Sequence, residues 1–385
     1  LRATIRGLPD RGGLSGLSDI RGRPRLFTER TSVGLDVHAR SVVAHAMDVQ
    51  TGEIFKARLC PDPVEVTAWI KALPGPSAAI YEAGPTGYGL ARTLLSHDIR
   101  TVVAAPSKLQ RPSGSRVKTD AIDAEHLSTL LRLDAFTAVT VPDELTEAAR
   151  DLVRAREDCR SDLMRARHRL SKLLLRHGIV YSGGQAWSNA HDAWLRRQRF
   201  DSPLVQAAFD EAYDSVITIT ARRDRLDERI EAMAENSQYT DAVRRLVCLR
   251  GISTLTGFGL AVEIGDWSRF TGNSIGSFVG LIPSENSSGQ SRSQGPITKT
   301  GNSHARRLLV EAAWHHQHRY VPGKTIRDRW DLASPAARAR GDLGNRRLNH
   351  RWNQFKKRKK RPIVANAAIA RELAGWCWSL AVLEE

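Results

Sequence analysis

Residues 31–54 read TSVGLDVHARSVVAHAMDVQTGEI, and the architecture of the N-terminal third of the chain follows from them. Two apolar runs, separated by the polar break HARS, predict two strands joined by a turn, and the TGE after them is typical of a hairpin. The stretches SAAIYEAG (77–84) and IRTVVAAP (99–106) predict buried strands, and helical patterns lie between and after these strands. The element order ββαβαβα therefore predicts a mixed sheet covered by helices over residues 31–140.

Long helical patterns replace the strands after this region. Residues 143–176 and 202–236 each carry a recurrent apolar stripe, which in the first run consists of Leu145, Leu152, Leu163, Leu170 and Leu174. Two long helices joined by a polar loop predict an antiparallel coiled-coil arm at 141–238, and a compact helical bundle is the alternative. We expect a mainly helical domain at 239–330 and a basic helical segment at 331–385, which makes the fold class α/β plus all-α.

The charge of the chain favours a polyanionic partner. The chain has 58 Lys and Arg residues against 42 Asp and Glu residues, a net charge of +16, and such an excess is typical of proteins that bind nucleic acid. Basic residues are densest at 338–361, with Trp352 among them and Trp330 nearby. This stretch predicts a phosphate-binding surface, and a solvated helical face is the alternative.

Cysteine usage and hydropathy indicate the compartment. The four cysteines are scattered, with no Cys-x-x-Cys pair, which argues against a disulfide framework or a zinc ribbon and favours a reducing cytoplasm. No apolar run approaches the roughly 20 residues of a membrane span, and no signal peptide is visible. We expect no membrane association and a cytoplasmic, nucleoid-associated protein. The Gly- and Arg-rich residues 1–30 predict a disordered basic arm.

Four carboxylates lie where an α/β sheet presents functional groups. Asp36 lies late in the first strand and Glu82 ends the strand AAIYE, while Asp120 and Asp123 open the helix of KTDAIDAEHL, where residues three apart share one face. Converging carboxylates suit Mg²⁺ or Mn²⁺, since these cations bind oxygen. The four acids therefore predict one metal site for phosphodiester chemistry. Taken singly, each also fits an ordinary turn, cap or helix-start position.

The motifs GLDVH, YEAGPTGYGL and KTDAIDAEHL resemble the Asp–Glu–Asp–Asp motifs of the Holliday-junction-resolvase-like domain in a large family of bacterial insertion-sequence transposases. The later stretches GISTLTGFGLAVEIGDWSRF and FVGLIPSENSSGQSRSQGPITKTGNSHARRLLVEAAW resemble the C-terminal transposase domain of that family, and the match covers roughly residues 31–320. The resemblance implies a ribonuclease-H-like fold at 31–140 and a serine transposase domain at 239–330. It also implies Mg²⁺-dependent recombination of donor and target DNA, guided by a structured bridge RNA of the element.

The resemblance further implies a catalytic serine just before a glycine, shortly after the GL-x-P turn. In GLIPSENSSGQ this position is Ser288, and the adjacent Ser287 is the alternative. An exposed hydroxyl on a Gly-flanked loop can attack phosphorus when a base or a metal activates it. Arg292 and Lys299 follow closely and are candidates to stabilise the transition state. A covalent phosphoserine conserves bond energy, so strand exchange would need no ATP. The sequence agrees, since it contains no P-loop pattern for nucleotide binding.

These features favour an RNA-guided DNA recombinase, or transposase, of an insertion sequence that acts as a dimer or tetramer. The alternative is a metal-dependent Holliday-junction-type endonuclease without a covalent intermediate. The carboxylates disfavour a third class, a non-catalytic nucleic-acid-binding protein. Nucleic-acid contacts are expected from basic residues of the helix start, the serine loop and the C-terminal segment: Lys118, Arg292, Lys299, Arg306, Arg307, Lys356, Lys357, Arg358, Lys359 and Lys360.

Overall fold

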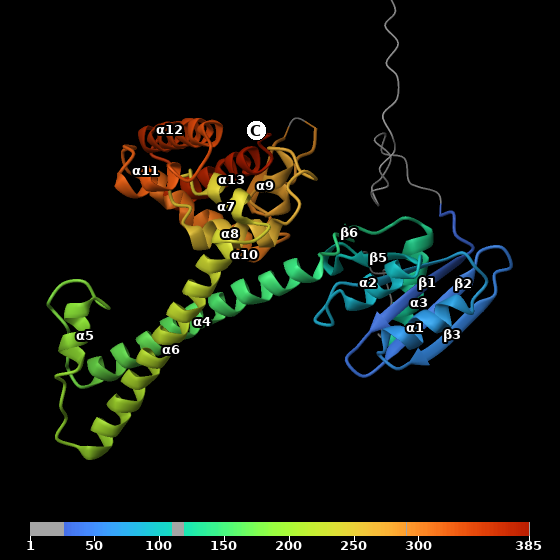
Figure 1. The fold of residues 1–385 in the computed structure, drawn as a ribbon, viewed down its shortest axis with the longest axis horizontal. Coiled ribbons are helices and arrows are strands. Elements are labelled where there is room, and N and C mark those ends of the chain that lie inside the picture. Colours follow the sequence, from blue (N-terminus) through green and yellow to red (C-terminus); the bar gives the residue numbers. More distant parts are fainter. Residues whose placement is uncertain (1–26, 110–118, 290, 385) are drawn as a thin grey trace, which may run out of the picture. The chain divides into compact units, whose positions relative to one another are not determined.

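The computed structural model describes residues 27–109, 119–289 and 291–384. The chain divides into two compact units, unit 1 up to Pro142 and unit 2 from Asp143 onward, whose elements are labelled in Figure 1. Most of the predicted basic arm lies outside the described residues. In the described part of the chain, no helix is both long and apolar enough to cross a membrane.

Unit 1 is built on a six-stranded mixed sheet. The strand order is β3-β2-β1-β4-β5-β6, in which β1, β4 and β5 run parallel and the other pairings are antiparallel. This arrangement is compatible with the predicted ribonuclease-H-like fold. The strands are β1 (Thr31–Val37), β2 (Val42–Asp48), β3 (Ile54–Leu59), β4 (Ser77–Glu82), β5 (Arg100–Ala104) and β6 (Ala138–Val139).

The expected order ββαβαβα was wrong in omitting β3 and β6. The sequence of β3, IFKARL, alternates between exposed and half-buried residues because it lies at the edge of the sheet with only one neighbouring strand. The other omitted strand, β6, has two residues and pairs with β5. Both strands lie at edges, where the apolar signal that marks buried strands is weakest.

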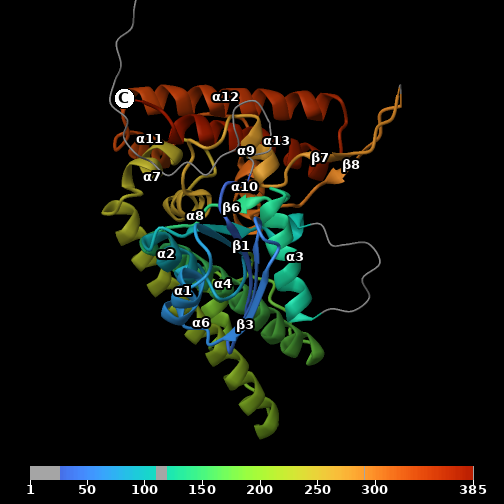
Figure 2. The same ribbon diagram turned by 90° about the vertical axis from the view of Figure 1, so that its right-hand side faces the viewer.

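Helices cover both faces of this sheet. Helices α1 (Pro63–Lys71) and α2 (Gly89–Ser96) lie on one face, and α3 (Asp120–Arg132) lies on the other (Figure 2). The first face holds the larger core, which includes Val33 and Leu35 of β1. On the second face α3 packs through Leu127 and Leu131 against β4 and β5. The α3 face is therefore the thinner layer, and it is the one that carries the acidic residues.

The close approach of α3 to β1 depends on Gly34. A Cβ atom built at Gly34 lies 2.0 Å from the carbonyl oxygen of Ala124 and 2.5 Å from the backbone nitrogen of Ser128. Nearby, the hydroxyl of Ser32 donates to the carbonyl of Ser128 at 2.7 Å. Glycine is needed at this position because the obstacle is helix backbone, which cannot move aside as a flexible side chain can.

We expect Gly34→Ala to destabilise unit 1 by at least about 2 kcal/mol, because overpacking against backbone forces α3 away from the sheet. Urea unfolding of the variant measures the loss. The matched control is Gly89→Ala, since a Cβ at Gly89 meets nothing within 4 Å among the described residues. Equal stability of the two variants would contradict the tight β1–α3 packing.

Unit 2 begins with a pair of long helices. Helices α4 (Glu144–Arg176) and α6 (Pro203–Glu235) pack along each other, with α5 (Asn189–Leu195) in the connection between them (Figure 1). Arg156 of α4 and Asp227 of α6 form an ion pair at 2.6 Å. The two helix ranges agree with the sequence prediction, but Leu145 of the predicted stripe is exposed.

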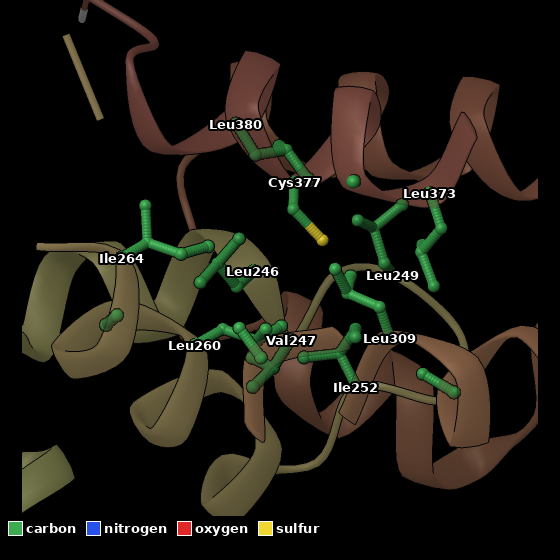
Figure 3. Packing of buried hydrophobic residues seen from close by; sticks show 14 of the residues in the cluster. Leu246, Val247, Leu249, Ile252, Leu260, Ile264, Leu309, Leu373, Cys377 and Leu380 are labelled. Atoms are coloured by element: carbon green, nitrogen blue, oxygen red, sulfur yellow. The ribbon is translucent and has the colours of Figure 1, made fainter. Parts of the chain in front are cut away.

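The rest of unit 2 is mainly helical and shares one large core. Helices α7, α8, α10, α12 and α13 contribute Leu246, Leu260, Leu309, Trp352 and Leu373, and Figure 3 shows part of this packing. The residues after 330 therefore belong to the same core as those before. The helices are α7 (Thr240–Leu246), α8 (Thr254–Ile264), α9 (Ser274–Phe278), α10 (Ser303–Ala313), α11 (Lys324–Trp330), α12 (Pro335–Lys357) and α13 (Pro362–Ala381), and a hairpin is formed by β7 (Pro283–Glu285) and β8 (Gln294–Ile297).

Candidate active site

The start of α3 is placed beside the end of β1 by simple geometry. Residues 32, 34 and 36 point to the same face of β1, because side chains of a strand alternate. Ser32 contacts Ser128, and Gly34 lies under Ala124. Two residues of strand and four residues of helix cover nearly the same length, so the next pair along this crossing is Asp36 with Asp120.

Asp36 and Asp120 come together with a third residue, His38. Nε2 of His38 lies 3.0 Å from Oδ2 of Asp36 and 3.8 Å from Oδ1 of Asp120. One ligand atom from each of these three side chains lies within 4.8 Å of the other two. The side chain of Asp36 is only 19% exposed, whereas those of His38 and Asp120 are about half exposed. The group thus has one inner carboxylate and two outer donors.

Glu82 lies on the same sheet edge. In the parallel register Tyr81 pairs with Leu35, so Glu82 is one position further along, next to Asp36 on the adjoining strand. Ile80 packs with the α3 residues, and strand alternation puts Glu82 on that same face. Glu82 is exposed, and the three converging side chains include His38 rather than Glu82.

The electrostatics of Asp36 indicate a place for a cation. Burial raises the pKa of Asp36 above its ordinary value, and the charges of Asp120 and Asp123 raise it further, whereas the hydrogen bond from His38 opposes both. Asp123 is therefore close enough to act on Asp36. A bound divalent cation would relieve this crowding of negative charge. Two carboxylates and an imidazole are a donor set that fits Mg²⁺ or Mn²⁺, with the nitrogen suiting Mn²⁺ better.

Sequence reasoning missed His38. The available signal was its spacing: His38 follows Asp36 by two residues in GLDVH and comes directly after the end of β1, which keeps it close to Asp36. Helix α3 itself agrees with the predicted start, since the Thr119 hydroxyl caps it by accepting from the Ile122 amide.

The two candidate serines differ in their surroundings. The Ser287 hydroxyl donates to Oε1 of Glu285 at 3.0 Å and accepts from the Ser293 amide at 3.3 Å. Ser288 uses its backbone to pair with Ser291 next to Gly289, whose φ is +55°. Among the described residues the Ser288 hydroxyl has no hydrogen-bond partner, and the residue is exposed. The Ser287 hydroxyl thus braces the hairpin, whereas that of Ser288 is open to an incoming group.

The loop that follows the hairpin is anchored at the base of α10. The carboxylate of Glu263 on α8 is buried and binds Arg154 at 3.0 Å, Asn302 at 2.6 Å and His304 at 3.1 Å. Burial raises the pKa of Glu263, but the hydrogen bonds from His304, Arg154 and Asn302 outweigh burial and lower it to about 2. Asn302 is also the N-cap of α10. This carboxylate therefore joins three helices of unit 2.

We expect Glu263→Gln to lower the free energy of unfolding of unit 2 by roughly 3 kcal/mol near neutral pH, since removing one partner leaves buried groups unpaired. The low end of the usual range applies because the Arg154 side chain is 55% exposed. The folded-state pKa of Glu263 is depressed, so its stabilisation is present above about pH 4.5 and is lost as the pH falls toward 2.

Thermal unfolding as a function of pH measures both effects of Glu263→Gln. The variant should lose the part of the acid dependence that comes from Glu263. The control is Glu311→Gln, whose side chain is 54% exposed and pairs with Arg307 on the surface. A surface pair of this kind contributes at most about 1 kcal/mol. Equal unfolding curves for the two variants would disprove the anchoring role.

The predicted nucleic-acid contacts fall into three groups. Lys118 lies outside the described residues. Several cations are used within the protein: Arg306 donates to the carbonyls of Val279 and Thr300, Arg307 pairs with Glu157 and Glu311, and Arg292 lies 3.5 Å from Glu285. Among the described residues, the side chain of Lys299 forms no hydrogen bond or ion pair. The backbone of Lys299 has a φ of +56°.

The basic C-terminal stretch divides in the same way. The last residues of α12 and the turn after it carry the exposed residues Lys356, Lys357, Arg358, Lys359 and Lys360. Of these, Lys356 donates to the Gln317 carbonyl and Lys360 lies over the ring of Phe355. Arginines earlier in α12 pair with acids such as Glu372. Trp352 is buried, and the indole of Trp330 donates to the Cys248 carbonyl. The tryptophans thus pack with the core, and the exposed cations lie at the end of α12 and in the turn after it.

Comparisons with known proteins agree with this organisation. A family model described as "Transposase IS116/IS110/IS902 family" matches residues 243–330. A second transposase model, DEDD_Tnp_IS110, matches residues 33–179, which contain all four acids predicted from the sequence. The two matches lie in the order expected from the motifs.

Individual transposases also match this chain over most of its length. "Putative transposase y4qE" of Sinorhizobium fredii is 38% identical over 304 residues, which cover 78% of this chain and 74% of the relative. "Transposase for insertion sequence element IS1533" of Leptospira borgpetersenii is 29% identical over 340 residues, 86% of this chain and 97% of the relative. The chain belongs to the IS116/IS110/IS902 family of transposases and has the DEDD domain of IS110-type transposases at its N-terminal end.

Proposed function

We propose that this transposase is a DNA recombinase in which Asp36, Glu82, Asp120 and Asp123 hold a divalent metal and Ser288 attacks phosphorus. The observation that carries the proposal is the convergence of Asp36 and Asp120 where α3 meets the end of β1. Mg²⁺ or Mn²⁺, when bound, supplies positive charge that stabilises the transition state of phosphoryl transfer.

The side chains have distinct tasks in this proposal. Asp36 is the inner carboxylate, and His38 is a positioning residue that fixes its orientation through the 3.0 Å hydrogen bond. Ser288 forms a bond from Oγ to phosphorus while the bond from phosphorus to a sugar oxygen breaks. The hydroxyl proton passes to a base, and the leaving sugar oxygen takes up a proton. The phosphoserine retains the bond energy, so a second strand can be joined without ATP.

We infer the partners from the charge and the resemblance. A net charge of +16 and the exposed cations at the end of α12 and in the turn after it suit the binding of donor and target DNA. A structured bridge RNA of the element is the proposed guide, and a dimer or tetramer is the proposed assembly. Sequencing of RNA that co-purifies with the protein tests the guide directly, since a random population of cellular RNA would contradict it.

Strand cleavage should require a divalent metal. We expect the protein to cut labelled DNA of the element ends in Mg²⁺ or Mn²⁺ and to stop in excess chelator. Without the metal, the carboxylates supply only negative charge, which cannot stabilise the negatively charged transition state. Mn²⁺ binding followed by electron paramagnetic resonance should be lost in Asp36→Asn and kept in the wild-type protein. Cleavage that persists in chelator would overturn the metal proposal.

A further inference from the structure

A cavity adjoins the candidate active site in unit 1. It has a volume of about 270 Å³ and is lined by β2, β3 and the first turn of α3. His45 pairs with Lys56 in the β2–β3 register, and Val43 pairs with Arg58, so these four residues line one wall on the α3 face. Because β3 is an edge strand, α3 leaves this part of the sheet open.

The residues that line the cavity are neighbours of the acidic group. Val43 of the cavity is the register partner of Asp36 on β1. Ala121, which lines the cavity on the other side, directly follows Asp120. The cavity is therefore next to the place where the proposed function puts a nucleic-acid strand.

One side chain of the cavity is buried with an unused nitrogen. His45 is 4% exposed, and its Nδ1 lies 2.9 Å from the Ser128 hydroxyl. That hydroxyl donates to the Glu125 carbonyl at 2.9 Å, so it accepts from Nδ1–H of His45. Nε2 of His45 has no hydrogen-bond partner among the described residues. An unsatisfied buried polar atom costs about 1–3 kcal/mol, which favours a ligand that reaches it.

The charges of the cavity are those of an anion site. Lys56 and Arg58 are both exposed, and in the described part of the chain neither forms an ion pair. The Arg58 guanidinium donates to the Ser41 hydroxyl at 3.2 Å, which steadies it beside the cavity. Burial lowers the pKa of His45 below its ordinary value, the charge of Glu125 on α3 opposes this effect, and the charge of Lys56 adds to it. Two cations beside one cavity favour an anion over a metal ion.

We propose that this cavity binds a phosphodiester of the DNA strand held at the active site, adjacent to the phosphate that is cut. Phosphate oxygens pair with Lys56 and Arg58 and reach Nε2 of His45, which becomes a donor when the ring takes up a second proton beside the phosphate. The subsite fixes the register of the strand, so that one chosen phosphate lies at Asp36 and Asp120. It rests on the proposed function, because the strand is placed by the carboxylates.

The test uses the full chain and a fluorescent single-stranded DNA oligonucleotide, with affinity measured by anisotropy across a range of salt concentrations. Log affinity falls with log salt. The double variant Lys56→Gln/Arg58→Gln should make this slope less steep by about 0.7, the value for one phosphate contact to a single strand. The matched control is Lys71→Gln/Arg132→Gln, which removes two exposed cations of the same unit. An equal slope in both double variants would overturn the proposal.

A second measurement locates the phosphate. Oligonucleotides that carry one neutral methylphosphonate at successive positions should show a position at which the wild-type protein loses affinity and the Lys56→Gln/Arg58→Gln variant loses none. A loss of the same size in both proteins at every position would refute the subsite, and so would a position effect seen only with RNA of the same sequence.

Mn²⁺ binding separates this proposal from the metal proposal. The Lys56→Gln/Arg58→Gln variant should bind Mn²⁺ as the wild-type protein does. If the wild-type protein bound no Mn²⁺, the proposed function would fail, whereas the salt slopes would still decide whether the cavity binds phosphate.

Discussion

Asp120→Asn is expected to slow DNA strand cleavage by roughly 10³-fold, because metal stabilisation of the transition state is worth several kcal/mol and about 1.4 kcal/mol corresponds to a factor of ten. The asparagine keeps the shape of the side chain but removes the charge that faces His38 and Asp36. Affinity for nucleic acid should not fall, since the change makes the chain less acidic. A cleavage assay on labelled DNA of the element ends, together with a binding assay, measures both properties.

The control for Asp120→Asn is Asp98→Asn. Asp98 is exposed in unit 1 and has a positive φ of 59°, a conformation that asparagine accepts readily. The same chemical change is thus made away from the site, and cleavage should stay at the wild-type rate. Wild-type cleavage by Asp120→Asn would remove Asp120 from the metal site, and a loss of rate in both variants would indicate a general effect of charge.

Ser288→Ala is expected to abolish a covalent protein–DNA adduct. If Ser288 attacks phosphorus, the wild-type protein remains attached to a labelled suicide DNA substrate after denaturation. Alanine removes the hydroxyl but no carboxylate, so Mn²⁺ binding should persist while recombination stops. A denaturing gel with the labelled DNA shows the adduct as a band of lower mobility.

Ser287→Ala is the matched variant, because it removes a neighbouring hydroxyl that is bonded to Glu285 and to the Ser293 amide. We expect this variant to keep the adduct at a reduced rate, since the hairpin loses a brace but not the proposed nucleophile. Loss of the adduct in Ser287→Ala alone would move the nucleophile to Ser287. Cleavage in Mg²⁺ without any wild-type adduct would reject the serine mechanism and favour the hydrolytic endonuclease.

The amino-acid sequence by itself determined the local elements that carry the acids. The long helices α4 and α6 have the predicted ranges to within two residues, and α3 begins at Asp120 behind the cap Thr119. Such features depend on neighbours three or four residues away, through helical periodicity and capping, so a reader of the sequence can find them. The positions of Asp36 and Glu82 at strand ends are local in the same sense. The sequence did not predict the edge strands β3 and β6, because their residues are not buried on both faces and lack a continuous apolar run.

Only the tertiary structure decided which side chains meet. His38 joins Asp36 and Asp120 because α3 crosses β1 over Gly34, a contact between residues about ninety positions apart that no local pattern encodes. The same crossing leaves the cavity of His45, Lys56 and Arg58 open beside the acids. In unit 2, packing buries Trp352 and pairs Arg307 with Glu157. The sequence alone placed Trp352 and Arg307 in basic stretches that were expected to face nucleic acid. Burial and pairing depend on the elements that pack around a residue, and those elements come from distant parts of the chain.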